Sequence, residues 1–410
     1  MSMSMPKTLF TSCLRTRSSL PIHSGRLIYL TPHPHVRRVS SRTQPCRLPS
    51  LSSVHRQHCG LESGRPGVQR YLTTTSSTSA TATPTTNMSR RAPVNAQSVD
   101  APLTMSATFL VLSVAEGDDA ISTVRSTLAS VADLIKNVSI RDSSAQFAAT
   151  VGIGSRIWDR LTNKPRPAEL HPFREFKGNK HTAVSTPGDL LFHIRADRRD
   201  LCFEFEKQVM DLLGDAVKVE DETVGFRYFD MRDLLGFVDG TANPVGPDVP
   251  EAVLVAEGDN LGLDVSGSSS IGGSYVVVQK YLHNLGGWKK LGTEGQESVI
   301  GRTKFDNVEL DDADDDKQKA HKTLATVEQD GVEYDILRDN MPFGSPGSTE
   351  YGTYFIGYSR RLWVTEKMLE RMFIGDPPGL HDRILDYSTP VTGSTFFVPS
   401  LAFLDGLGDD

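Results

Sequence analysis

The chain has 410 residues and a formal net charge of −7, which is enough sequence for two or three domains of ordinary size. The charge is unevenly divided, because residues 1–100 carry 13 basic and 2 acidic side chains whereas the rest carry 31 basic and 49 acidic ones. An acidic body lacks the basic footprint of a nucleic-acid-binding protein, and no apolar run reaches the roughly 20 residues that span a bilayer. We therefore expect neither a nucleic-acid partner nor a membrane partner.

The first hundred residues have the composition of a leader. They are rich in Ser, Thr, Arg and Pro, and no acidic residue precedes Glu62. Such composition is typical of organellar transit peptides. We expect a disordered, transit-peptide-like leader and linker over residues 1–100 and a mitochondrial localisation. A plastid destination, a cytosolic form starting at Met88 and a basic tail without a targeting role are the alternatives.

The body has a single cysteine, since the other three lie in this leader. A disulfide framework and a cysteine-rich zinc site are therefore excluded for the body. Cys202 falls within a helical pattern, and we expect it to be a small buried residue of the core.

Periodic apolar sequence begins at residue 101, and its first half alternates strands with helices. The patterns predict strands over 107–114, 147–155, 189–196 and 223–231, and helices over 120–138 and 201–215. This is the β-α-β-β-α-β order of a ferredoxin-like domain. We place that domain at residues 101–245.

The second half repeats the scheme. Strands are predicted over 274–282, 333–340, 351–359 and 394–404, and helices around Trp288 and over 362–376. The segment FHIRADRRDLCFEFEKQVMDLLGD aligns without a gap to TYFIGYSRRLWVTEKMLERMFIGD, 161 residues later. This similarity indicates an internal duplication. The predicted fold is α+β, with two tandem ferredoxin-like domains in a dimeric α/β-barrel-like arrangement, their antiparallel sheets packed together, and the second domain covers residues 246–410.

One histidine is well placed to bind a metal. No histidine pair in the body has the spacing of an HExxH zinc motif. A haem needs only one axial imidazole below an open face, and His321 follows the acidic run ELDDADDDKQKA in a short segment that can present one imidazole inward. An ordinary structural histidine is the alternative.

Two other segments concentrate polar side chains. In a strand over 333–340, Arg338 and Asn340 share one face while Glu333 takes the other, so the strand can send charges to both sides of a planar cofactor. An edge strand with its charges in water is the alternative. The segment GFVDGTANP sets Asp239 between an apolar pair and a glycine. Read alone, it is a surface turn whose aspartate caps its own backbone.

Several segments, taken together, resemble a known family. GFVDGTANP is similar to the GxxDG motif of dye-decolorizing peroxidases, and further segments resemble the bacterial-type B branch of that family in order and spacing: GGSYVVVQKYLHNLGGW, QESVIGRTKFDNVEL, AHKTL, ILRDNMPFG, GTYFIGYSRRL, TEKMLERMFIG and TPVTGSTFFVPS. The resemblance covers residues 104–404. It departs from the family pattern at Ala320, where a serine commonly precedes the axial histidine.

The resemblance implies a haem b peroxidase that uses hydrogen peroxide to oxidise organic donors such as phenols and dyes through an oxidised iron-oxo haem intermediate. It also implies association into a homo-oligomer. A haem-binding or haem-handling protein with incidental peroxidase activity and a non-haem interaction module are the alternatives.

The resemblance also assigns roles to individual residues. It implies a proximal iron ligand, a distal carboxylate with its guanidinium and amide partners, a carboxylate behind the proximal histidine, a cation near a haem propionate and a glycine that lets the backbone approach the haem. In that order these are His321, Asp239, Arg338, Asn340, Glu333, Arg302 and Gly240.

Overall fold

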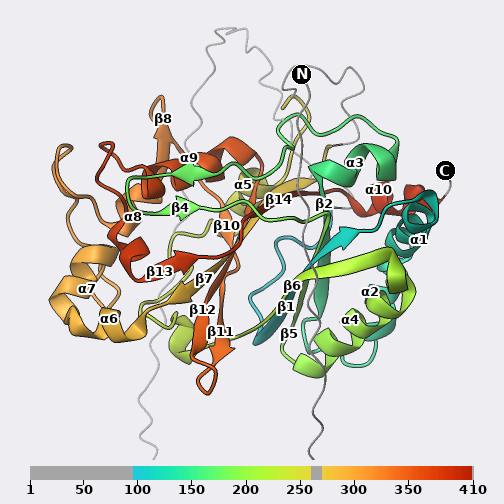
Figure 1. The fold of residues 1–410 in the computed structure, drawn as a ribbon, viewed down its shortest axis with the longest axis horizontal. Helices are drawn as coiled ribbons and strands as arrows, with labels where there is room; N and C mark the ends of the chain where they lie inside the picture. Colours follow the sequence, from blue (N-terminus) through green and yellow to red (C-terminus); the bar gives the residue numbers. More distant parts are fainter. Residues whose placement is uncertain (1–95, 260–269, 409–410) are drawn as a thin grey trace, which may run out of the picture. The chain divides into compact units, whose positions relative to one another are not determined.

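The computed structural model describes residues 96–259 and 270–408. The leader predicted over residues 1–100 lies almost entirely outside these described residues. Ten strands of the described chain join into one antiparallel sheet, with helices packed around it (Figure 1). Within the described residues, no helix is long and apolar enough to cross a membrane.

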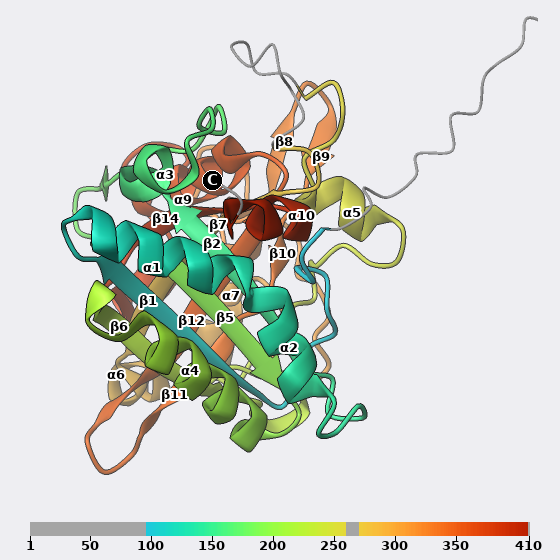
Figure 2. The same ribbon diagram turned by 90° about the vertical axis from the view of Figure 1, so that its right-hand side faces the viewer.

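The first half of the sheet carries helices on one face. Figure 2 shows α1, α2 and α4 lying across strands β1 and β5. The elements of this half are β1 (Ser106–Val114), α1 (Asp118–Ala129), α2 (Val131–Ser139), β2 (Ala148–Gly154), α3 (Ser155–Thr162), β3 (Phe176–Lys177), β4 (Thr182–Ala183), β5 (Leu190–Ala196), α4 (Arg199–Leu213) and β6 (Val217–Phe226).

The second half contains longer loops between its strands. Its helices are α5 (Asp248–Val253), α6 (Leu285–Lys290), α7 (Thr293–Ile300), α8 (His321–Leu324), α9 (Leu362–Phe373) and α10 (Leu401–Asp405). Its strands are β7 (Ser274–His283), β8 (Val327–Gln329), β9 (Val332–Tyr334), β10 (Leu337–Arg338), β11 (Met341–Ser345), β12 (Glu350–Ser359), β13 (Ser388–Pro390) and β14 (Ser394–Val398).

The two halves join edge to edge at two seams, where β2 pairs with β14 and β6 with β11. Because β12 also pairs with β7, eight strands close into a ring in the order β1-β5-β2-β14-β7-β12-β11-β6. Apolar side chains fill its interior, where the rings of Phe109 and Tyr354 stack with centroids 4.1 Å apart. The predicted α+β duplication is therefore confirmed.

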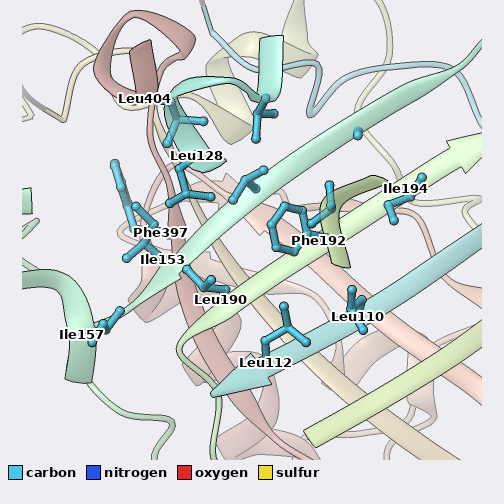
Figure 3. Close-up of a cluster of buried hydrophobic side chains, with 14 of the residues drawn as sticks. Leu110, Leu112, Leu128, Ile153, Ile157, Leu190, Phe192, Ile194, Phe397 and Leu404 are labelled. Carbon is cyan, nitrogen blue, oxygen red and sulfur yellow. The ribbon is translucent and has the colours of Figure 1, made fainter. Parts of the chain in front are cut away.

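Alternate residues of the central strands serve two cores. Along β1, Phe109 and Val111 point into the strand ring, whereas Leu110 and Leu112 pack under the helices. Figure 3 shows this second core, in which Leu110 and Leu112 lie near Phe192 of β5. Strands that are buried on both faces read as nearly continuous apolar runs. Cys202 belongs to the same core and is fully buried, as predicted.

Four predicted elements differ from the structure. The helix expected over 120–138 is divided at Ser130, which separates α1 from α2. The N–H of Ser130 donates to the carbonyl of Thr127. The strand expected over 223–231 begins six residues earlier and ends at Phe226. The strand expected over 394–404 gives way to α10 after Val398. The strand expected over 333–340 is two short strands with different partners, because β9 pairs with β8 and β10 with β12.

Candidate functional site

The part of the chain that follows β6 encloses a cavity of about 520 Å³ that is lined by all seven residues singled out in the sequence: Asp239, Gly240, Arg302, His321, Glu333, Arg338 and Asn340. Every residue of the described lining falls between positions 233 and 388. Apolar side chains supply much of the rest of the wall, including Leu235, Phe237 and Phe355. An apolar cavity of this size with a few convergent polar groups is typical of cofactor sites.

The imidazole of His321 forms part of the cavity wall. His321 is the first residue of the short helix α8, and its Nδ1 lies 2.7 Å from Oδ2 of the buried Asp382. Its side chain is 32% exposed, toward the cavity that it lines. Burial alone would lower the pKa of His321, but the charge and hydrogen bond of Asp382 outweigh it and raise that pKa above its usual value.

Asp382 is itself held in place. Its N–H donates to the carbonyl of Met372 at 2.8 Å, and its Oδ1 accepts from the N–H of Ile384 at 3.0 Å. A carboxylate on Nδ1 fixes the tautomer of the ring and makes its other nitrogen more basic. Among the described residues the His321 ring makes its hydrogen bond through Nδ1, so Nε2 is available to a ligand in the cavity.

The position predicted for the carboxylate behind His321 was wrong. Glu333 lies on β9 opposite Glu328, with an exposed side chain at the rim of the cavity, and Asp382 takes the predicted place. The reason is the break in the predicted strand, because the β8–β9 hairpin leaves the sheet before β10 begins. No sequence spacing connects Asp382 with a histidine 61 positions earlier, and sequence reasoning missed it.

The carboxylate of Asp239 forms another part of the cavity wall. Its Oδ1 accepts from the N–H of Gly240 at 2.7 Å and from Nδ2 of Asn340 at 3.3 Å. Gly236 and Gly240 have φ values of 93° and 78°, a region that favours glycine. The segment is therefore a turn whose aspartate caps its own backbone, and the same turn places that aspartate in the cavity wall.

The half-buried guanidinium of Arg338 lines the same cavity. Arg338 donates through Nη2 to the carbonyl of Ala325 at 3.3 Å, and it also contacts Met368. Burial lowers its pKa, and the charges of Asp239 and Asp335 partly offset that effect. An arginine remains protonated under these conditions. The cavity lining thus contains a permanent cation as well as the carboxylate of Asp239.

Asn243 connects the turn that carries Asp239 to Arg338. Its Nδ2 donates to the carbonyl of Arg338 at 2.7 Å, while its Oδ1 accepts from the N–H of Arg338 at 2.9 Å. This pair of hydrogen bonds ties the turn of Asp239 to strand β10. From the sequence, Asn243 was interpreted only as part of a turn, although the Asn-Pro pair that marks it was visible.

A second carboxylate that sequence reasoning missed also lines the cavity. Asp233 accepts a hydrogen bond from the N–H of Phe237 at 3.0 Å. Burial and then the charge of Asp239 raise its pKa to about 7. Asp233 is therefore neutral through much of the acidic range.

The residues present fit a haem group. A haem requires one axial donor, an open face opposite and a cation near its carboxylates. His321 offers Nε2 as a donor atom, and Asp239, Arg338 and Asn340 line the same cavity. Arg302 lines the cavity with its guanidinium paired to Glu309 at 3.0 Å.

Comparison with known proteins settles the family. Models of the N-terminal and C-terminal parts of Dyp-type peroxidases match residues 96–227 and 230–403. The chain belongs to the Dyp-type peroxidase family. The dye-decolorizing peroxidase of Mycobacterium tuberculosis is 50% identical over 313 residues, which cover 76% of this chain and 90% of that protein.

Solved structures of Dyp-type peroxidases also match this chain. DyPB from Rhodococcus jostii RHA1 matches with a TM-score of 0.71 at 50% identity, covering 76% of this chain and 98% of that one. A variant of it in complex with heme matches equally well. The encapsulated DyP-type peroxidase from Mycobacterium smegmatis matches with a TM-score of 0.71 at 49% identity, covering 76% of this chain and 97% of that one. This dye-decolorizing peroxidase therefore uses haem b.

The mitochondrial localisation predicted from the leader is contradicted by these relatives. They are dye-decolorizing peroxidases of bacteria, one of them solved in an encapsulated form. Basic, serine-rich composition is also found in tails that carry no targeting signal, so composition alone led to the wrong interpretation. Residues 1–95, on which it was based, lie outside the described residues.

Proposed function

We propose that this dye-decolorizing peroxidase activates hydrogen peroxide with Asp239 as the proton carrier and Arg338 as the charge-stabilising group, opposite a haem held by His321. The observation that carries the proposal is the convergence of the imidazole of His321, the carboxylate of Asp239 and the guanidinium of Arg338 on a single cavity. A haem carrier has no need of the two charged distal groups.

The lower wall would hold the cofactor. His321 would bind the iron through Nε2, with Asp382 orienting the ring, and Arg302 would pair with a propionate at the rim. Haem b, when bound, supplies the redox chemistry that accepts two oxidising equivalents from peroxide and returns them to an organic donor. The strong carboxylate–imidazole pair increases electron donation from the protein side.

Asp239 carries the proton in this proposal. An ionised carboxylate can take the proton from one oxygen of hydrogen peroxide and deliver it to the other, which then leaves as water. A positioned acid–base group is typically worth about 10²–10⁴ in rate. Asn340 fixes the carboxylate by donating to its Oδ1, while its own Oδ1 accepts from the N–H of Ile356 at 3.1 Å.

Arg338 stabilises charge. The departing oxygen becomes negative as the O–O bond breaks, so a fixed guanidinium favours the transition state over neutral peroxide. Removing one preorganised donor of this kind commonly costs about 10²–10³ in rate. Its backbone is tied by Asn243 to the turn that carries Asp239.

Stopped-flow mixing of the haem-loaded enzyme with hydrogen peroxide tests these roles. We expect Asp239→Ala and Arg338→Leu to slow the loss of the resting haem spectrum by about 10²-fold or more, and His321→Ala to lose the haem or its resting spectrum. Glu333→Gln is the matched control, because this carboxylate lies at the rim, and it should react at the parent rate. Parent rates in both distal variants would remove the assignment.

Association and domain boundaries stay predictions. Exposed apolar side chains, including Phe229 and Phe305, support the predicted homo-oligomer, which light scattering of the purified chain would test. The boundary at residue 245 lies beyond the junction of the two family models at residues 227–230.

A further inference from the structure

We propose that His181, His381 and Asp386 form a binding site for a divalent transition-metal ion such as Zn²⁺, separate from the haem cavity. Among the described residues, these three offer ligand atoms that all lie within 4.8 Å of one another. None of them lines the cavity that holds His321. Two imidazoles and one carboxylate are a donor set that suits divalent first-row metals and leaves open positions for water.

The separations between the ligand atoms are already close to those of a metal site. Nε2 of His181 lies 2.9 Å from Oδ1 of Asp386, and Nε2 of His381 lies 3.1 Å from the same oxygen. With bonds of about 2.0–2.1 Å, ligand atoms of a tetrahedral zinc site are about 3.4 Å apart. Small side-chain rotations are therefore enough to admit an ion among them.

The backbone positions of the two histidines are fixed by hydrogen bonds. His181 closes the turn between β3 and β4, and its carbonyl accepts from the N–H of Gly178 at 3.0 Å. A Cβ added at Gly178 would lie 1.9 Å from the carbonyl oxygen of Phe373, so this turn packs directly on the end of α9. The carbonyl of His381 accepts from Nε2 of Gln318 at 3.0 Å.

An exposed lysine competes for the same carboxylate. Lys180 reaches Oδ1 of Asp386 with its Nζ at 2.5 Å, while 57% of its side chain is exposed. Exposed ion pairs of this kind contribute little, so the lysine can swing into water when an ion enters. Loss of Lys180 should therefore increase the affinity of a metal site for its ion, whereas it would only remove a contact from a purely hydrogen-bonded cluster.

The ion would join two distant parts of the chain. His181 belongs to the β3–β4 hairpin, whereas His381 and Asp386 flank Asp382, the partner of His321. Binding would therefore fasten the segment that orients the proximal imidazole. Because only the folded chain assembles the three ligands, binding must also raise the melting temperature.

Isothermal titration of the haem-loaded full chain with Zn²⁺, after removal of adventitious metal by a chelator, tests the site. We expect one ion per chain at this site and affinities at least about tenfold weaker in His181→Ala and Asp386→Asn. Lys180→Met should bind several-fold more tightly, since it keeps all three ligands and removes the competitor. His171→Ala is the matched control, because His171 pairs with Glu366 elsewhere, and it should leave the affinity unchanged.

X-ray absorption at the zinc edge supplies a readout independent of activity. We expect the scattering of two imidazoles in the parent chain and of one in His181→Ala. Undetectable binding, equal affinity in the ligand variants and the parent, or a zinc spectrum without paired imidazoles would overturn the proposal. If a ligand variant fails to fold, Lys180→Met still decides, because unchanged affinity in that variant contradicts the competition on which the site depends.

Discussion

Two carboxylates near His321 differ in what they can do to its imidazole. Asp382 is fully buried and reaches Nδ1 at 2.7 Å, whereas Glu333 is exposed on a hairpin that leaves the sheet. A buried charged hydrogen bond is worth considerably more than an exposed one. Only Asp382 can therefore hold the ring orientation and influence the electron density at Nε2.

Replacing each carboxylate by its amide distinguishes them. Asp382→Asn removes the negative charge at nearly constant shape, so we expect the reduction potential of the bound haem to become more positive and the iron–histidine stretching frequency to fall. Spectroelectrochemistry and resonance Raman spectra of the ferrous protein measure both. Glu333→Gln should leave both at parent values; equal shifts in the two variants would contradict the assignment to Asp382.

At the scale of single residues, the sequence singled out Asp239 and Arg338, which line one cavity, but not Asp382, which contacts His321. Asp239 and Arg338 were identified because each lies within a short recognisable segment, GFVDGTANP and ILRDNMPFG. The hydrogen bonds of Asp382 and Asn243 cross 61 and 95 positions of the chain. Such pairs depend on how loops fold over the sheet, and no local pattern encodes them.

Among the helices, α4 contains a buried acid that makes its packing sensitive to pH. Glu206 faces β6, where Glu222 is its acidic neighbour. Burial, and then the charge of Glu222, raise the pKa of Glu206 to about 7 from an ordinary value of 4.5. Because the pKa is raised on folding, its favourable contribution is fully present below pH 4.5 and is lost as the pH rises through about 7.

Glu206→Gln removes this ionisation while it preserves the shape of the side chain. We expect the melting temperature of the variant to exceed that of the parent by a few degrees at pH 8 and the difference to vanish near pH 5. Differential scanning calorimetry at several pH values measures it. Glu204→Gln, on the exposed face of the same helix, should show no such pH dependence. A constant offset at every pH would contradict the raised pKa.

At the scale of elements, amphipathic patterns located the long elements and failed where the chain changes partner. Helices α4 and α9 each bury one stripe, and strands β5 and β12 precede them in both halves, so the duplication was visible in the sequence. The segment over 333–340 has a continuous strand pattern, yet its two ends pair with different neighbours. Hydrogen-bond pairing between distant strands decides such breaks.

The whole molecule depends on the closure of the strand ring between β7 and β12. Gly352 lies at this closure opposite Leu282, and a Cβ there would fall 1.7 Å from the carbonyl oxygen of Tyr281. Backbone atoms cannot give way as flexible side chains do. Any side chain at this position must therefore push the two strands apart.

Gly352→Ala should lower the melting temperature by about 5 °C or more and accelerate loss of haem, since Thr353 and Phe355 of the same strand line the cavity. Calorimetry and transfer of haem to an acceptor globin measure the two effects. Gly347→Ala provides the control, because nothing lies within 4 Å of a Cβ there, and it should behave as the parent. Equal stability of the two variants would show that the closure tolerates a wider spacing.

The cavity lining is confined to positions 233–388, so the two halves of the chain contribute differently to the site. Side chains fill the core between the sheet and the helices of the first half. The residues that line the cavity all follow β6. We therefore expect mutations on the outer helices of the first half to have little effect on turnover. Those helices are the natural place to graft a tether, a reporter or a second catalytic module.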